Sequence, residues 1–138
     1  MQNSRNADVL RHIISYCNDI VETIERFGED YEVFAKDSVY RNATALCVLQ
    51  IGELTSNLTD DFKKTYAGMP WTQIKALRNV IAHSYGKIDV ESLWETITGD
   101  IPKLKTYCSS IIQKFDVLMQ ESITKAEDEQ EIKDISID

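Results

Sequence analysis

The residue types most suited to chemistry gather in one short segment, residues 78–86, which reads RNVIAHSYG. His83 supplies a side chain that gains or loses a proton near neutral pH, and Arg78 supplies a planar cation that can bind two phosphate oxygens at once. Asn79 lies four residues before His83 and shares a helix face with it, whereas Arg78 lies roughly 140° away around the same helix. The segment therefore combines an acid–base group with a phosphate-binding group.

Helices are predicted throughout the part of the chain that must position this segment. Apolar residues recur at steps of three and four, and the predicted spans are about residues 5–27, 38–58, 59–66, 70–86 and 89–118. The expected ends are marked by a stop at Gly28, caps at Ser38, at Thr59 or Asp60, and at Asp89, a first-turn proline at Pro70 and a second stop at Gly86. The segment RNVIAHSYG thus falls at the C-terminal end of the fourth helix.

Two of these helices have broad apolar faces that we expect to be buried. In the second helix the expected face is Val39, Ala43, Leu46, Cys47, Gln50, Ile51, Leu54 and Leu58, and in the last helix it is Leu93, Ile97, Ile101, Leu104, Cys108, Ile111, Phe115 and Leu118. Pro102 lies inside the second of these faces and is expected to kink the last helix near Gly99.

The fold class predicted is all-α: an antiparallel bundle of four to five helices with a kinked last helix. No alternating strand pattern or internal repeat occurs in the 138 residues. We expect residues 1–124 to form the bundle and residues 125–138 to form a mobile acidic tail. The tail holds six acidic residues and two lysines, so it carries −4 of the net charge of −8.

Composition favours a soluble protein of a reducing compartment. There is no apolar run long enough for a membrane span and no secretory leader, so a cytoplasmic location without membrane association is expected. The cysteines Cys17, Cys47 and Cys108 are widely spaced in apolar helical sequence, which predicts buried free thiols. The acidic net charge does not exclude nucleic acid, because a basic group surrounds the motif: Lys63, Lys64, Lys75, Arg78 and Lys87.

The chain resembles the HEPN superfamily as it occurs in HepT-like toxins. The resemblance rests on the arginine, four residues, histidine, one residue, tyrosine pattern of the motif. It extends to VLQIGELTSNL in the second helix, to MPWTQIKALRNVIAHSYGKID, and to LWETITGDIPKLK in the last helix, proline included. It covers about residues 5–118, and the joint pattern is far more specific than the arginine-to-histidine spacing alone.

This resemblance implies an all-α homodimer that acts as a metal-independent endoribonuclease toxin. It also implies a partner, a minimal nucleotidyltransferase (MNT-type) antitoxin that adenylylates the motif tyrosine. Carried over to this chain, Arg78 and His83 become the catalytic pair, Asn79 an accessory polar group, and Tyr85 the site of adenylylation and a substrate contact. Neither a cofactor nor a metal ion is expected, since the sequence lacks paired acids, phosphate-binding glycines and metal-ligand spacing.

The residue chemistry agrees with RNA as substrate. Attack of a ribose 2′-hydroxyl on the adjacent phosphorus cuts RNA without a metal, provided that a base, an acid and a cation are present. One histidine cannot be base and acid in the same step, and each chain offers one in the motif. If the reaction is RNA cleavage, two chains meeting at the motif helices would supply both His83 side chains.

Gly52 and Glu53 interrupt an apolar helix and so require an explanation. A glycine within a helix costs up to about 1 kcal/mol, which a close approach of another helix would offset. We expect Glu53 to be an accessory residue, either a buried partner of Arg41 or Arg78 or simply an exposed polar group.

The alternative to an enzyme is a non-catalytic HEPN module that binds nucleotide or serves as a scaffold for the nucleotidyltransferase. A weaker third alternative is a helical dimerisation domain.

Overall fold

The computed structural model describes residues 2–83 and 89–136, and within these ranges all side chains except those of residues 2, 3, 80, 82, 83, 135 and 136. In chain order the elements are α1 (Gln2–Phe27), α2 (Tyr31–Lys36), α3 (Ser38–Thr55), α4 (Asp60–Thr65), α5 (Trp71–His83), α6 (Val90–Glu95), the π-helical turn η1 (Thr96–Asp100) and α7 (Ile101–Ser136). The described residues contain no strand. The predicted all-α class is confirmed.

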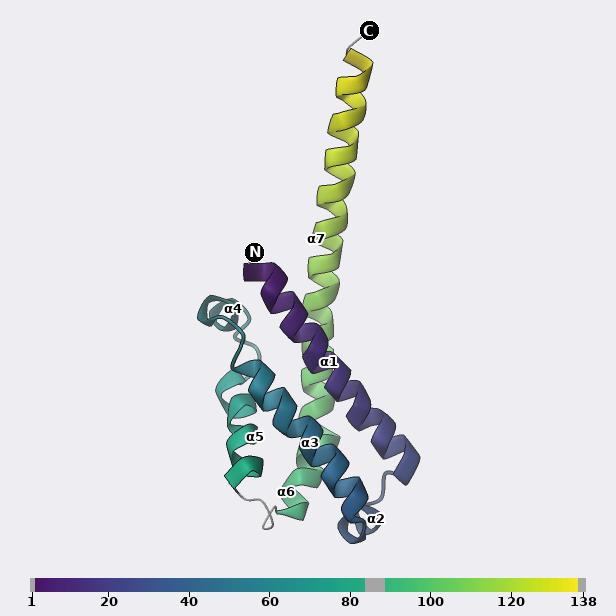
Figure 1. Cartoon of the computed structure of the whole chain (residues 1–138), viewed down its shortest axis with the longest axis vertical. Helices are drawn as coiled ribbons and strands as arrows, with labels where there is room; N and C mark the ends of the chain where they lie inside the picture. The colour runs from purple at the N-terminus through teal and green to yellow at the C-terminus, as the bar shows by residue number, and fades with distance from the viewer. Residues whose placement is uncertain (1, 84–88, 137–138) are drawn as a thin grey trace.

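The four longer helices α1, α3, α5 and α7 form an antiparallel bundle. Figure 1 shows α1 and α5 running in one direction and α3 and α7 in the other. Helix α3 packs against both α1 and α5, and α1 packs against α7. The short helices α2, α4 and α6 close the ends of this arrangement. Helix α5 carries residues 78–83 of the motif segment, and it packs mainly against α3.

The core contains the three cysteines as free, buried thiols, as predicted. They come from three different helices: Cys17 from α1, Cys47 from α3 and Cys108 from α7. Burial raises the pKa of Cys17 and of Cys108 to about 12, and the pKa of Cys47 to about 11. The neutral thiol is therefore the stable form of all three in the folded protein.

Most predicted helix ends are confirmed, because they depend on local chemistry. Gly28 ends α1 with φ 101°, and its N–H donates to the carbonyl of Ile24 at 2.8 Å. The Thr59 hydroxyl accepts from the N–H of Phe62 at 3.2 Å and caps α4. Asp89 caps α6, and hydrogen bonds from the Ser92 side chain and backbone lower the pKa of the Asp89 carboxyl.

The cap of α3 is one residue earlier than predicted. Asp37, and not Ser38, precedes the first helical residue, and its carboxylate accepts from the N–H groups of Val39 at 3.0 Å and Tyr40 at 3.2 Å. The aspartate was overlooked because serine and aspartate stand side by side and both are favourable caps. Since Ser38 adopts helical geometry, it is the first residue of α3.

The predicted buried face of α3 is partly wrong. Val39 and Leu46 are 64% and 57% exposed. Thr44 and Thr55 are fully buried in their place, and their hydroxyls donate to carbonyls of their own helix, at 3.1 Å to Tyr40 and 2.9 Å to Ile51. A threonine whose hydroxyl is hydrogen-bonded within its own helix can be buried at little cost. A prediction based on apolar residues alone therefore misses it.

The kink predicted in the last helix is confirmed and takes the form of η1. Within this turn the N–H of Ile101 donates to the carbonyl of Thr96, five residues earlier. Pro102 follows at once and has no N–H to donate, so the wider turn accommodates the proline at the start of α7. The buried seam continues to Ile111, but Leu118, which we expected within it, is 57% exposed.

Helix α7 extends well beyond the bundle (Figure 1). It continues through Lys125 without a break to Ser136, and the side chains of residues 116–134 are all exposed. The end of this projection points away from α5. Whether residues 125–138 move independently stays a prediction. None of the described helices is both long and apolar enough to cross a membrane.

Candidate active site

The site is built where α3 and α5 cross. At Gly52 the two backbones are so close that an added Cβ would lie 2.7 Å from the Cβ of Arg78 and 2.8 Å from its backbone nitrogen. Only glycine leaves room for Arg78 at this point. The close helix approach expected from the mid-helix glycine is therefore present, and it fixes the backbone of Arg78 against α3.

The Arg78 guanidinium is held in a defined direction by two polar neighbours. Its Nε donates to Oε1 of Glu53 at 2.5 Å, and its Nη1 donates to Oδ1 of Asn79 at 3.3 Å. Of the two arginines considered as partners of Glu53, Arg78 is the one in contact; Arg41 instead donates to the carbonyls of Phe34 and Ala35. The contact predicted for Glu53 is present.

The Glu53–Arg78 pair is half exposed and not buried as we expected. The side chains of Arg78 and Glu53 are 45% and 48% exposed. A pair this open adds at most about 1 kcal/mol to stability, so its main consequence is orientation. Because the Nε edge faces Glu53, the outer edge of the guanidinium is left toward solvent, where it can receive a phosphate.

An open cleft of about 370 Å³ surrounds this pair. Its lining residues come from α3, from the residue after it and from α5: Gly52, Glu53, Ser56, Lys75, Arg78 and Asn79. The cleft brings two cations and one carboxylate together, and no ion pair is recorded for Lys75 in the described part of the chain. Such a site suits an anion that approaches along α5.

His83 is the last residue of α5, and its backbone continues the regular helix that carries Arg78. Positions 78 and 83 are thus roughly 140° apart around the axis, as calculated from the sequence, while 79 and 83 share a face. The side chain of His83 is outside what the structure describes, and Tyr85 and Lys87 lie outside the described residues altogether. The roles assigned to His83 and Tyr85 stay predictions.

The residues that line the cleft differ in two ways from those predicted. Lys63 and Lys64 lie on α4 and do not line the cleft, so of the described lysines in this group Lys75 is the one that the fold brings to Arg78. Ser56 lines the cleft but was not predicted. Its signal was available: it follows Glu53 by three residues and therefore shares its helix face.

Comparison with known proteins identifies the family of this chain. The family model described as "Ribonuclease HepT-like" matches residues 13–111. A protein of Caldanaerobacter subterraneus subsp. tengcongensis named "Putative RNase TTE0752" is 32% identical over 105 residues, which cover 76% of this chain and 92% of that protein. The "Probable ribonuclease HepT" of Thermococcus cleftensis is 35% identical over 95 residues, covering 65% of this chain and 86% of that protein.

No solved structure matches significantly. The family match covers most of the chain and includes α3, α5 and the first part of α7, so it contains every residue that lines the cleft. The chain belongs to the HepT-like ribonuclease family of the HEPN superfamily.

Proposed function

We propose that this protein is the toxin of a toxin–antitoxin pair and cuts RNA as a metal-independent endoribonuclease. The observation that supports this most directly is the cleft at Gly52, in which Glu53 and Asn79 turn the guanidinium of Arg78 outward. A fixed, half-exposed arginine beside a lysine that forms no ion pair with the described residues suits the phosphate of an RNA backbone.

The reaction proposed is an internal transfer within the RNA. One His83 accepts the proton of a ribose 2′-hydroxyl, and the 2′-oxygen then attacks the adjacent phosphorus. The bond to the 5′-oxygen breaks, and this oxygen leaves with a proton from a second His83, giving a 2′,3′-cyclic phosphate. Arg78 stabilises the negative charge on the phosphorane oxygens in the transition state.

Two chains are needed to supply two His83 side chains, and the surface of α3 offers a place for them to meet. Val39 and Leu46 are exposed aliphatic residues spaced by seven, so they lie on one stripe of α3. Glu53, again seven residues further, continues the same stripe to the cleft. A second copy packed on this stripe would bury both aliphatic side chains and bring the two motif helices together.

The proposed antitoxin is a minimal nucleotidyltransferase that modifies Tyr85. The phenol oxygen would attack the α-phosphorus of ATP, forming a phosphodiester to AMP and releasing pyrophosphate. The attached phosphate carries negative charge to the neighbourhood of the motif, where the RNA phosphate must bind. Inhibition then follows from repulsion and from steric exclusion together.

The test is cleavage of total cellular RNA by the purified protein in EDTA, after its intact mass has shown that Tyr85 carries no AMP. Arg78→Ala and His83→Ala are expected to lower the cleavage rate by at least about 100-fold. Matched controls are Arg26→Ala, which removes an arginine paired with Glu22 at 2.7 Å outside the cleft, and His12→Ala, at an exposed position on α1.

Each outcome has a clear meaning. Loss of cleavage in the two motif variants with retention in both controls supports the ribonuclease. If the unmodified wild-type protein leaves RNA intact in EDTA, the proposed activity is wrong, and a non-catalytic nucleotide-binding or scaffold module replaces it.

A further inference from the structure

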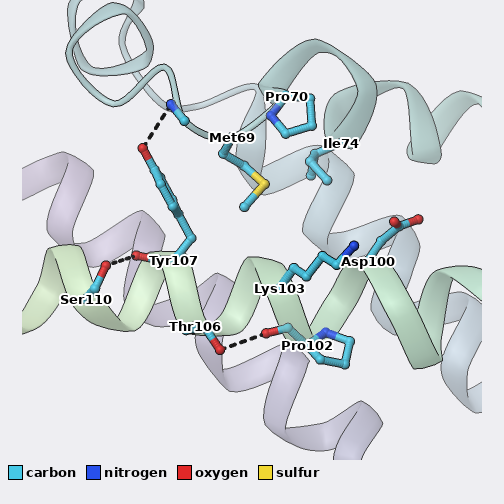
Figure 2. A pocket seen from close by; sticks show the side chains of 10 residues that line it. Met69, Pro70, Ile74, Asp100, Pro102, Lys103, Thr106, Tyr107 and Ser110 are labelled. Atoms are coloured by element: carbon cyan, nitrogen blue, oxygen red, sulfur yellow. Dashed lines mark hydrogen bonds between the residues drawn. The ribbon is translucent and has the colours of Figure 1, made fainter.

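A second cavity, of about 790 Å³, lies beside the N-terminal part of α5 and shares no lining residue with the cleft. It is bounded by the connection from α4 to α5, by α5 itself and by the first part of α7 (Figure 2). Most of its lining is apolar and comes from Met69, Pro70, Ile74, Pro102 and the ring of Tyr107. Its lining suits a largely apolar group.

The wall formed by Tyr107 is fixed in place. The Tyr107 hydroxyl accepts a hydrogen bond from the N–H of Gly68 at 3.1 Å. An added Cβ at Gly68 would lie 2.9 Å from Cε2 of Tyr107, so the connection can approach the ring this closely only because it carries glycine. The ring also packs edge-on against Trp71, with centroids 6.0 Å apart. A preformed wall of this kind lowers the entropy lost on binding.

The rim of the cavity carries both a cation and a carboxylate. Lys103 and Asp100 are exposed and three residues apart, and the side chain of neither forms an ion pair or hydrogen bond with the described residues. The other rim hydroxyls are already engaged: Thr106 donates to the carbonyl of Pro102 at 3.0 Å and Ser110 to that of Tyr107 at 2.7 Å. Figure 2 shows Lys103 and Asp100 on the same side of the opening.

We propose that this cavity binds one nucleotide of the RNA strand that the cleft cuts, an inference that rests on the proposed function. The base packs against the Tyr107 ring and the apolar lining, because bases stack on aromatic groups regardless of sequence. Lys103 binds a backbone phosphate, and Asp100 accepts a hydrogen bond from a ribose 2′-hydroxyl, the group that distinguishes RNA from DNA.

The position of the cavity relative to the cleft supports a shared strand. Ile74 lines the cavity and the next residue, Lys75, lines the cleft, so the two sites are neighbours along α5, on directions roughly 100° apart around it. Thr72 and Ala76 are exposed small residues on the outer face of α5. A helix is about 10 Å across, so a strand crossing this face can occupy both sites with a few nucleotides.

The first test measures steady-state cleavage of an RNA oligonucleotide by Lys103→Gln and by Thr106→Trp, which fills the opening. Each is expected to raise KM about ten-fold and to leave kcat within about two-fold, since stacking and phosphate contacts bind the strand away from the reacting atoms. The matched controls on α7 are Lys114→Gln and Thr124→Trp, both at exposed positions outside the cavity. Unchanged KM in both cavity variants would overturn the inference while leaving the ribonuclease intact.

The second test does not depend on cleavage. Fluorescence anisotropy measures binding of the RNA oligonucleotide, and of its DNA equivalent, to His83→Ala protein with and without Thr106→Trp or Asp100→Asn. Thr106→Trp should weaken RNA binding about ten-fold, and Asp100→Asn should reduce the preference for RNA over DNA. If neither change alters RNA affinity, the cavity is not a subsite for the strand.

Discussion

The crossing of α3 with α5 and the projecting half of α7 are opposite kinds of helical structure. At the crossing, the backbones approach until Gly52 has no room for a methyl group. In residues 116–134 of α7, every side chain is exposed. Close packing restricts the conformations of the side chains at the crossing, whereas the exposed side chains of the projecting half of α7 are almost unrestricted. Function that needs an oriented arginine is therefore expected at the crossing, where orientation is imposed by packing.

The largest effect is expected from Leu46→Glu, which places a charge on the exposed stripe of α3. If two chains must meet there, the variant should be monomeric and cleave RNA at least about 100-fold more slowly, because one chain lacks the second acid–base group. Analytical ultracentrifugation and the cleavage assay measure this. Ile132→Glu, at a position 66% exposed on α7, is the control and should change neither. A monomeric Leu46→Glu protein with full activity would contradict the dimeric site.

Gly52→Ala should follow in size, because its Cβ collides with backbone and Cβ atoms of Arg78. We expect the free energy of unfolding to fall by about 1–3 kcal/mol and cleavage to fall at least about ten-fold. Urea denaturation and the RNA assay measure the two effects. Gly99→Ala is the matched control: no atom lies within 4 Å of its added Cβ, so stability should hold or rise by up to about 1 kcal/mol. Equal behaviour of the two variants would disprove the tight crossing.

Glu53→Gln should have a smaller effect confined to catalysis. The amide preserves the shape of the carboxylate but weakens its hold on Nε of Arg78, so kcat is expected to fall by about three- to ten-fold. The free energy of unfolding should change by less than about 1 kcal/mol, because the pair is half exposed. Glu22→Gln removes the charge from an equivalent surface pair with Arg26 and should leave kcat unchanged. A kcat of Glu53→Gln equal to that of the wild type would contradict the role of Glu53 in orienting Arg78.

The smallest effect is expected from ending the chain after Lys125. The acidic end of α7 points away from α5, and it could mask the cleft of its own chain only by leaving that position. RNA affinity should therefore be the same for the shortened and full-length proteins from low to moderate salt. A higher affinity of the shortened protein that disappears as salt rises would instead show electrostatic masking.

The sequence predicts those features best that depend on interactions between residues close together in the chain. Gly28 and Asp89 act within one helical turn and were predicted correctly, and Thr59 is one of the two caps predicted for its helix. Leu46 was placed in the core wrongly, because hydrophobic spacing identifies an apolar side chain but not what covers it. Thr44 and Thr55 were missed for the opposite reason, since their hydroxyls are satisfied within their own helix.

The candidate site followed the same division. The motif identified Arg78 and Asn79, and the unusual glycine and glutamate of α3 pointed to a contact that the fold contains. The openness of the pair could not be predicted, because exposure depends on how far neighbouring helices extend around it. The cavity beside Tyr107 was also beyond reach, since it joins Gly68 to a residue 39 positions later.

The three buried thiols can serve as probes of local unfolding in the bundle. Each sits on a different helix, and each is neutral and shielded while that helix is packed. A thiol reagent can modify one only during a fluctuation that exposes it, so the labelling rate of each cysteine reports the frequency of that fluctuation. The labelling rate of Cys47 on α3 would then report local opening of the helix that holds Arg78. The rates of Cys17 and Cys108 would report opening of α1 and α7 separately.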